Sequence, residues 1–181
     1  VGSVSSPYER ARTLAAIATI AARADDRVVA RAIIQKAFDL AGADGIRDFA
    51  LMDIATAQAL AGDSAAASKN FRQSFDQVEG DNQSAVVYAQ ARAGDVEGAI
   101  RNARTITFLP GRAHAMARIA DARLDGGDSA GALVTAREIA DEDLRVAALA
   151  RIAEAQARSG NARDARATLR EADQWARAQT G

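Results

Sequence analysis

Hydrophobic residues recur along the chain at the three- and four-residue spacing of one helix face. The clearest stretches are Leu51-x-x-Ile54-Ala55, Met116-x-x-Ile119-Ala120 and Leu149-x-x-Ile152-Ala153, which place their apolar side chains on one stripe. No window has the strict alternation that a half-buried strand requires. The pattern predicts an all-α protein of ten helices, over residues 7–23, 27–41, 46–60, 64–78, 82–93, 96–108, 112–125, 129–140, 143–158 and 162–178.

Pairs of Gly with Asp or Asn divide this pattern into repeating units. Gly62-Asp63, Gly94-Asp95, Gly127-Asp128 and Gly160-Asn161 follow one another at steps of 32, 33 and 33 residues. Gly supplies the left-handed conformation that ends a helix, and Asp or Asn caps the next one. Four residues later stands a small residue that lets two helices approach closely: Ala67, Ala99, Ala132 and Ala165. Each unit is therefore predicted to be an antiparallel helix-turn-helix.

The ends of the units have signals of their own. Ser6-Pro7-Tyr8-Glu9 is a capping box that begins the first helix. A looser first copy of the repeat surrounds Asp26, and second helices are expected to stop at Gly42, Gly80, Pro110-Gly111 and 141–143. We expect one repeat domain over residues 7–181, after a disordered lead-in or tag remnant at 1–6. Its units span about 7–42, 46–80, 82–110, 112–141 and 143–178.

Composition and charge narrow the function. The chain has 23 basic and 24 acidic residues, a balance that gives no long-range attraction to nucleic acid. No apolar run approaches the roughly 18 residues of a membrane span. The absence of Cys excludes disulfides and thiolate metal sites. We expect a soluble protein, cytoplasmic or periplasmic, and the richness in Arg and Ala is typical of a GC-rich bacterial genome.

The sequence contains no recognisable catalytic motif. His114 is the single His, and neither a nucleophile nor companion metal ligands are placed beside it by any spacing. Gly126-Gly127-Asp128 lacks the pattern and the preceding strand of a phosphate-binding loop. The sequence therefore predicts a protein that is not an enzyme and needs no metal or cofactor.

Three features of the units match those of a known repeat family. They are the Gly-Asp hinge, the Ala four residues beyond it, and the small residue that follows the apolar one on each first helix. The best stretch is Ala93-Gly94-Asp95-Val96-Glu97-Gly98-Ala99-Ile100. In these features the chain resembles the tetratricopeptide repeat family over about residues 7–178. It departs from the family in its period and in lacking the Trp and Tyr of the first helix, so no peptide-clamp motif is carried over.

The resemblance implies a right-handed α-solenoid of about five antiparallel helix-turn-helix repeats, whose first helices line a concave groove. A protein or peptide partner is expected in that groove, bound through an apolar anchor and through carboxylates held by Arg. The candidate partner-binding residues are Phe49, Met52, Tyr88, Arg92, His114, Arg118, Arg151 and Arg158. The implied function is a scaffold or adaptor, and the alternative is a module for structural self-assembly into a homo-oligomer.

Two alternatives stay open. The groove face could be a solvated surface on which the Arg residues pair with Asp121, Asp125 and Glu154. The last helix mixes Arg with acids, which favours a terminal cap with a polar outer side over an anion-binding surface. Trp175 is expected to pack over the open end of the last repeat.

Overall fold

The computed structural model describes residues 6–41 and 48–178, and over these ranges the chain is all-α, without a strand. The helix bounds agree with the sequence prediction to within three residues at each described end. The helices are α1 (Pro7–Arg23), α2 (Arg27–Ala41), α3 (Asp48–Leu60), α4 (Ser64–Gln77), α5 (Asp81–Arg92), α6 (Val96–Thr105), α7 (Leu109–Asp125), α8 (Ser129–Arg137), α9 (Glu142–Arg158) and α10 (Ala162–Ala178).

The predicted hinges form as expected between the two helices of each pair. At Gly94 the backbone φ is 98°, a conformation that an L side chain rarely adopts, and Asp95 then caps α6 by accepting a hydrogen bond from the Gly98 N–H. Asp25 takes the place of the glycine in the first pair, with a φ of 60°. The hinges therefore turn the chain back on itself in two residues.

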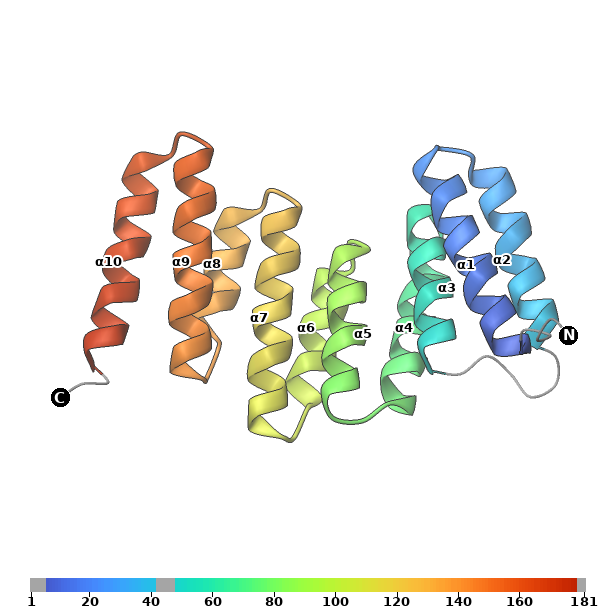
Figure 1. Cartoon of the computed structure of the whole chain (residues 1–181), viewed down its shortest axis with the longest axis horizontal. Helices are drawn as coiled ribbons and strands as arrows, with labels where there is room; N and C mark the ends of the chain where they lie inside the picture. Colours follow the sequence, from blue (N-terminus) through green and yellow to red (C-terminus); the bar gives the residue numbers. More distant parts are fainter. Residues whose placement is uncertain (1–5, 42–47, 179–181) are drawn as a thin grey trace, which may run out of the picture.

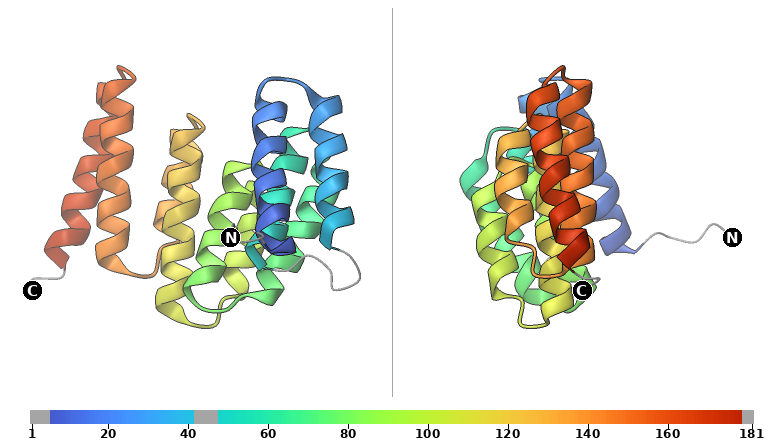
Figure 2. Two further views of the ribbon diagram at one scale, coloured as in Figure 1. Left: turned by 45° about the vertical axis from the view of Figure 1, so that its right-hand side comes forward. Right: turned by 90° about the vertical axis from the view of Figure 1, so that its left-hand side faces the viewer.

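The helices lie in two layers along a row. The odd layer, made of α1, α3, α5, α7 and α9, is continuous because each of these helices contacts the next. The even helices pack against their neighbours in the odd layer. Figure 1 shows the pairs side by side, with α1 and α2 at one end of the row and α10 at the other, and Figure 2 shows the same row from two further sides.

Small side chains allow the helices of each pair to cross closely. Ala99 and Ala132 are fully buried, Ala67 is 1% exposed and Ala165 is 4% exposed. Their equivalent in the first pair, Ala30, is also fully buried. A larger side chain at any of these positions would have to push two helices apart.

A buried polar pair joins the two helices in three of the repeats. Its members lie four residues before the hinge glycine and eight residues after it, and we call it the clasp. The clasps are Gln58–Asn70 at 2.7 Å, Gln90–Asn102 at 2.8 Å and Gln156–Thr168 at 2.9 Å. The first repeat has Ala21 and Ile33 at these positions, and the fourth has Arg123 and Thr135. The clasp satisfies amide and hydroxyl groups that burial would otherwise leave unpaired.

The hydrophobic core divides into two clusters. One is formed by α1, α2 and α3, with Ile34 and Ile54 among its members. The other runs from α3 to α10, with Phe71, Ile119 and Ile152 among its members. Helix α3 contributes side chains to both clusters, so it joins the first repeat to the rest of the row.

The expectation that Pro110-Gly111 ends a helix was wrong. Pro110 lies in the first turn of α7, where its missing N–H and fixed φ cost nothing. Helix α6 ends earlier, at Thr105, because Ile106 adopts an extended conformation and buries its side chain to 3% exposure. Ile139 is also fully buried, two residues beyond the end of α8, so a buried β-branched side chain closely follows the end of each of these helices.

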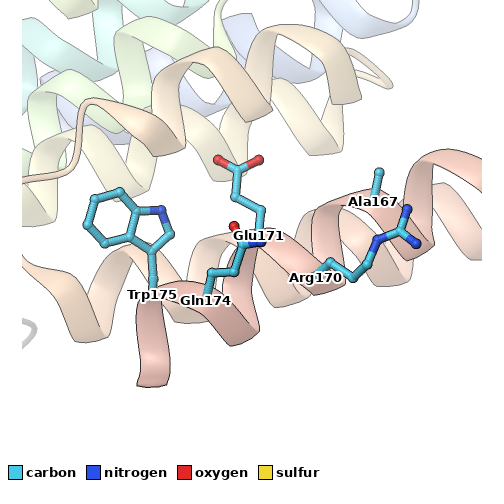
Figure 3. A pocket seen from close by; sticks show the side chains of 5 residues that line it. All are labelled: Ala167, Arg170, Glu171, Gln174 and Trp175. Carbon is cyan, nitrogen blue, oxygen red and sulfur yellow. The ribbon is translucent and has the colours of Figure 1, made fainter. Parts of the chain in front are cut away.

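The last helix packs differently from the expectation for Trp175. The guanidinium carbon of Arg145 in α9 lies 4.0 Å from the centre of the Trp175 ring. Glu171, one turn away on the same side of α10, accepts two hydrogen bonds from Arg137 of α8. Figure 3 shows both side chains along the hollow on this helix. Trp175 therefore packs against α9 of its own repeat, on the side of α10 from which Glu171 reaches α8, and the prediction that it covers the open end was wrong.

The outer side of α10 is not wholly polar. Leu169 lies two positions before Glu171, and therefore on nearly the opposite side of the helix. Its side chain is 52% exposed, whereas Phe71, Ala103 and Ala136 at the equivalent positions are fully buried. The predicted polar cap is thus interrupted by one apolar side chain.

Candidate functional site

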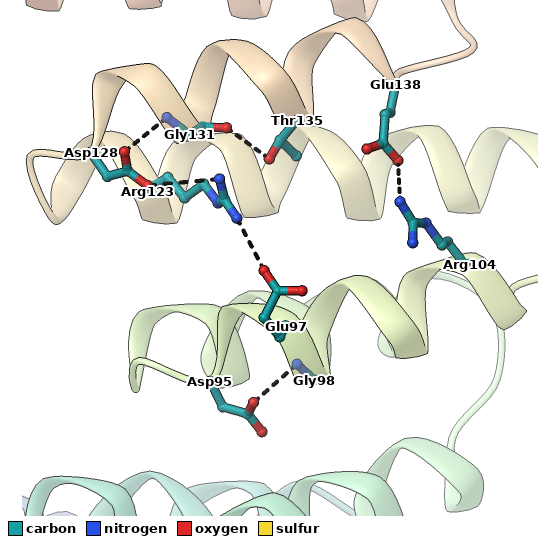
Figure 4. A network of polar contacts seen from close by, with 9 residues as sticks. All are labelled: Asp95, Glu97, Gly98, Arg104, Arg123, Asp128, Gly131, Thr135 and Glu138. Carbon is teal, nitrogen blue, oxygen red and sulfur yellow. Dashed lines mark hydrogen bonds and ion pairs between the residues drawn. The ribbon is translucent and has the colours of Figure 1, made fainter.

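Ion pairs between neighbouring repeats tie the even layer together. Arg104 of α6 pairs with Glu138 beyond α8 at 2.8 Å, and Arg137 pairs with Glu171 of α10 at 2.7 Å. Figure 4 shows the first of these pairs, together with Arg123 reaching toward acids of its own hinge and of the preceding repeat. The hydrogen bonds from Arg137 lower the pKa of Glu171, although its burial acts in the opposite direction. These side chains are engaged within the chain, which leaves them little capacity to hold a partner.

Asp95 is the most heavily bonded carboxylate at a hinge. It accepts hydrogen bonds from Ser68 of the preceding repeat at 2.6 Å, from Gln90 at 2.8 Å and from the Gly98 N–H at 3.0 Å. Burial raises its pKa, but the three hydrogen bonds together lower it below the usual value. Asp95 is therefore held ionised, as a structural link between repeats.

The odd layer carries a hollow near each end of its exposed face. The first lies between α1 and α3, where Arg12 pairs with Asp53 at 2.7 Å. Thr19 and Ile20 also line it. Arg12 is already paired, so this hollow offers hydroxyl groups, aliphatic surface and one further cation, Arg23.

The second hollow lies over α5, α7 and α9 and has a volume of about 490 Å³. Five of its eight lining residues are charged. Its lining residues are Tyr88, Asp121, Leu124, Asp125, Arg151, Glu154, Ala155 and Arg158.

Charges of both signs meet across this hollow. Arg151 of α9 pairs with Asp121 of α7 at 2.8 Å, and Arg92 of α5 lies 3.7 Å from Asp125. Arg158 lies 3.8 Å from Glu154 on its own helix. All of these side chains are partly or largely exposed, so each pair contributes little to stability and can exchange its partner.

Tyr88 is the aromatic centre of the same region. The guanidinium carbons of Arg92 and Arg118 lie 5.7 and 5.3 Å from the centre of its ring. Arg92 also donates a hydrogen bond to the Tyr88 hydroxyl at 3.4 Å, which raises the pKa of Arg92. Arg118 makes no ion pair among residues 6–41 and 48–178. An exposed cation thus lies against an aromatic ring beside a hollow.

Five of the predicted partner-binding residues come together in this region. Arg118 contacts the ring of Tyr88, and the other four are Tyr88, Arg92, Arg151 and Arg158. The alternative of pairing with acids holds for three of these cations, Arg92, Arg151 and Arg158. Their role in binding a partner stays a prediction.

The other three predicted residues lie elsewhere. Phe49 and Met52 are partly buried on α3, and Met52, like Tyr88, packs against the larger core cluster. His114 is exposed, and its Nδ1 lies 2.9 Å from the Pro110 carbonyl oxygen one turn back on α7. That contact is compatible with Nδ1 donating its proton to the chain itself, and it gives His114 no catalytic partner.

The described helices hold no cluster of three potential metal ligands. None of them is sufficiently long and apolar to cross a membrane. Comparison of the chain with protein families, with curated proteins and with solved structures finds no match.

Proposed function

We propose that this chain is a non-enzymatic scaffold or adaptor that binds a segment of a partner protein along its odd layer. In this proposal the row is a right-handed α-solenoid of the tetratricopeptide kind, and the odd layer lines its concave groove. The partner segment would carry an apolar or aromatic anchor and carboxylates, because the region around Tyr88 offers an aromatic ring and several Arg side chains.

The single observation that carries this proposal is the position of Arg118. Its guanidinium lies against the Tyr88 ring and has no carboxylate within ion-pair distance in the described part of the chain. A carboxylate of a partner can bind that guanidinium bidentately while an apolar side chain packs on the ring beside it. Arg118 and Tyr88 would then act as the anchor of the interface.

The test begins with affinity capture from a bacterial lysate, using the parent chain and a variant with Tyr88→Ala and Arg118→Glu. The captured segment is then synthesised, and its Kd is measured by fluorescence anisotropy. We expect the groove variant to weaken binding by roughly a hundredfold, because it removes an aromatic anchor and reverses a charge. A matched charge reversal outside the proposed groove, Arg101→Glu on α6, should leave the Kd unchanged.

Equal binding by the parent and the groove variant would place the partner on another surface and contradict the proposal. Circular dichroism of both variants checks that weaker binding does not come from loss of folding, since Arg118 and Arg101 are exposed but Tyr88 packs against the larger core cluster.

A second candidate function is self-assembly through the ends of the row. It is favoured by apolar side chains exposed at both ends, Ile20 at 67% and Leu169 at 52%. Light scattering over a wide range of concentration tests it. A mass that stays at the 18.9 kDa of one chain would rule out self-assembly.

A further inference from the structure

Helix α1 exposes a position that is buried in every later repeat. Ile17 lies eight residues before its hinge and is 45% exposed, whereas Ile54 at the equivalent position of α3 is fully buried. Ile54 is buried because it packs into the cluster formed with α1 and α2. The equivalents in the later repeats, Val86, Ile119 and Ile152, are fully buried as well. Ile17 therefore occupies the surface with which a repeat normally packs against the pair before it.

Helix α2 extends this apolar surface. Ile33 is only partly buried and replaces the polar clasp residue, whose equivalents Asn70, Asn102, Thr135 and Thr168 are exposed by at most 9%. Val29, one turn earlier on the same side, is 43% exposed. We call the surface formed by Ile17, Ile20, Val29 and Ile33 the N-terminal face. It has the apolar Ile33 where the second, third and fifth repeats have the second residue of a polar clasp.

Cations border this face. Arg10 and Arg23 lie on the same side of α1 as Ile17 and Ile20, at spacings of seven and three residues, and Lys36 lies one turn beyond Ile33 on α2. All three are exposed, and none makes an ion pair within the part of the chain that the structure describes.

The acids near these cations are engaged. Glu9 accepts a hydrogen bond from the Ser6 N–H, Asp25 pairs with Arg27, and Asp26 accepts from the Val29 N–H. Asp39, three residues beyond Lys36, accepts a hydrogen bond from Gln35. These carboxylates keep their charge, but residues 7–41 carry six basic against four acidic side chains, so the border of the N-terminal face is basic overall.

A second copy stacked in the register of the row fits this face poorly. Arg92 and Asp125 pair between neighbouring repeats at positions two residues before their hinges. Between copies, the same positions would bring Arg158 of one chain against Arg23 of the next. The equivalent of the Arg137–Glu171 pair would likewise set Arg170 against Lys36. Like charges at both positions oppose the stack.

The size of Ile20 opposes the same stack. It lies five residues before the hinge, where the later repeats have Ala57, Ala89, Ala122 and Ala155. Those alanines are buried or partly buried between neighbouring repeats. An Ile at this position is too large for helices that cross as closely as those of neighbouring repeats. A partner that binds the N-terminal face must therefore leave room for the Ile20 side chain.

We infer that the N-terminal face binds an acidic amphipathic helix of a partner protein. The apolar side of that helix packs on Ile17, Ile20, Val29 and Ile33. Its flanking Glu or Asp side chains pair with Arg10, Arg23 and Lys36. This site is distinct from the hollow over α5, α7 and α9, although Ile20 and Arg23 also line the hollow between α1 and α3.

The test is a selection from a displayed library of helical hairpins. Their exposed helix has a fixed leucine stripe, and its flanking positions are randomised among Glu, Gln and Lys. Clones that bind the parent chain are retained, and clones that also bind an Ile17→Ser, Ile20→Ser variant are removed. Both isoleucines are exposed, so the variant should fold like the parent. We expect the retained clones to be enriched in Glu at the flanks.

Purified hairpins then give the affinities. The double Ser variant should weaken the Kd of a selected hairpin roughly tenfold or more, because it removes two apolar contacts. Leu169→Ser, the same kind of change at the other end of the row, should leave the Kd unchanged. Arg23→Glu with Lys36→Glu should reverse the preference, so that a hairpin with Lys flanks binds more tightly than one with Glu flanks.

Enrichment of neutral or basic flanks would overturn the acidic partner. If no clone binds the parent chain in preference to the double Ser variant, the proposal of a binding site on the N-terminal face is wrong. Sedimentation of the parent as a dimer that Ile20→Glu dissociates would also overturn the inference, because a second copy would then cover the face.

Discussion

The clasp of the last repeat gives the sharpest test of the packing. Thr168 is 2% exposed and donates a hydrogen bond of 2.9 Å to Oε1 of Gln156, which is 6% exposed. Thr168→Val keeps the shape of the side chain and removes the donor. The Gln156 oxygen is then buried without that partner, which costs about 1–3 kcal/mol. This loss is a substantial part of the 5–15 kcal/mol that stabilises a typical domain.

Urea unfolding followed by Trp fluorescence measures the loss of stability in the last repeat. Trp175 is the single Trp of the chain and lies on α10 with Thr168, so its fluorescence reports the unfolding of the last repeat. We expect the midpoint for Thr168→Val to fall at an unchanged slope, since the surface exposed on unfolding is the same.

Two controls distinguish the effect of losing the buried hydrogen bond from the effect of losing a hydroxyl group. Thr13→Val removes an exposed hydroxyl that bonds only its own helix at Glu9, and it should change stability by less than about 0.5 kcal/mol. Adding Gln156→Leu to Thr168→Val removes both polar partners and should recover most of the loss. A Thr168→Val protein as stable as the parent, or a double variant without recovery, would refute the account of the clasp.

Three further predictions concern the hinges and the links between repeats. Ala99→Leu should destabilise the chain by about 1–3 kcal/mol, because Ala99 is fully buried at a close helix crossing; a parental urea midpoint would count against that crossing. Gly94→Ala should cost about 1–2 kcal/mol from the backbone alone, since φ is 98° and an added Cβ meets no atom within 4 Å; a normal melting temperature would contradict this. The pKa of Glu171 is lowered in the folded chain by its hydrogen bonds to Arg137, so the stability that it contributes is present above the usual value of 4.5 and is lost as the pH falls through the lower folded value. Arg137→Met should therefore make the acid-induced loss of stability shallower, and an unchanged pH profile of the urea midpoint would argue against the pair.

The hinges were predictable because their signals are local. Gly94 and Asp95 carry a conformational preference and a capping group within two residues, and neither depends on the rest of the fold. The stops of the second helices were less predictable. Ile106 and Ile139 bury their side chains in the core just after their helices end, and only the packed repeats determine which side chains the core can accept.

The clasp could have been found from the sequence. Gln90 and Asn102 are separated by 12 residues, and the same separation joins Gln58 to Asn70. Aligning the polar positions on the hinge, as we aligned the apolar ones, reveals this recurrence. The distance becomes meaningful only when the two helices are known to be antiparallel about that hinge.

The sequence placed Tyr88 and Arg118 on the same predicted groove face, but it did not predict the contact between them. The role of that face in binding a partner stays a prediction. The sequence could not decide which Arg pairs with an acid, because Arg92 and Arg151 both had acids within reach. That choice depends on side-chain conformations, and it leaves Arg118 on the aromatic ring.

The division of the core at α3 bears on cooperativity. Ile54 of α3 packs with α1 and α2, while Ala55 beside it belongs to the cluster that continues to α10. Because each repeat contacts mainly its neighbours, the stability of such a row is close to a sum of local terms. We therefore expect a species in which α1 and α2 have melted while the later repeats remain folded, so that unfolding of the whole chain departs from a single two-state transition. Mechanical force applied to α1 would accordingly unfold the protein in stages, and the contacts of α3 with α1 and α2 would determine the force needed for the first stage.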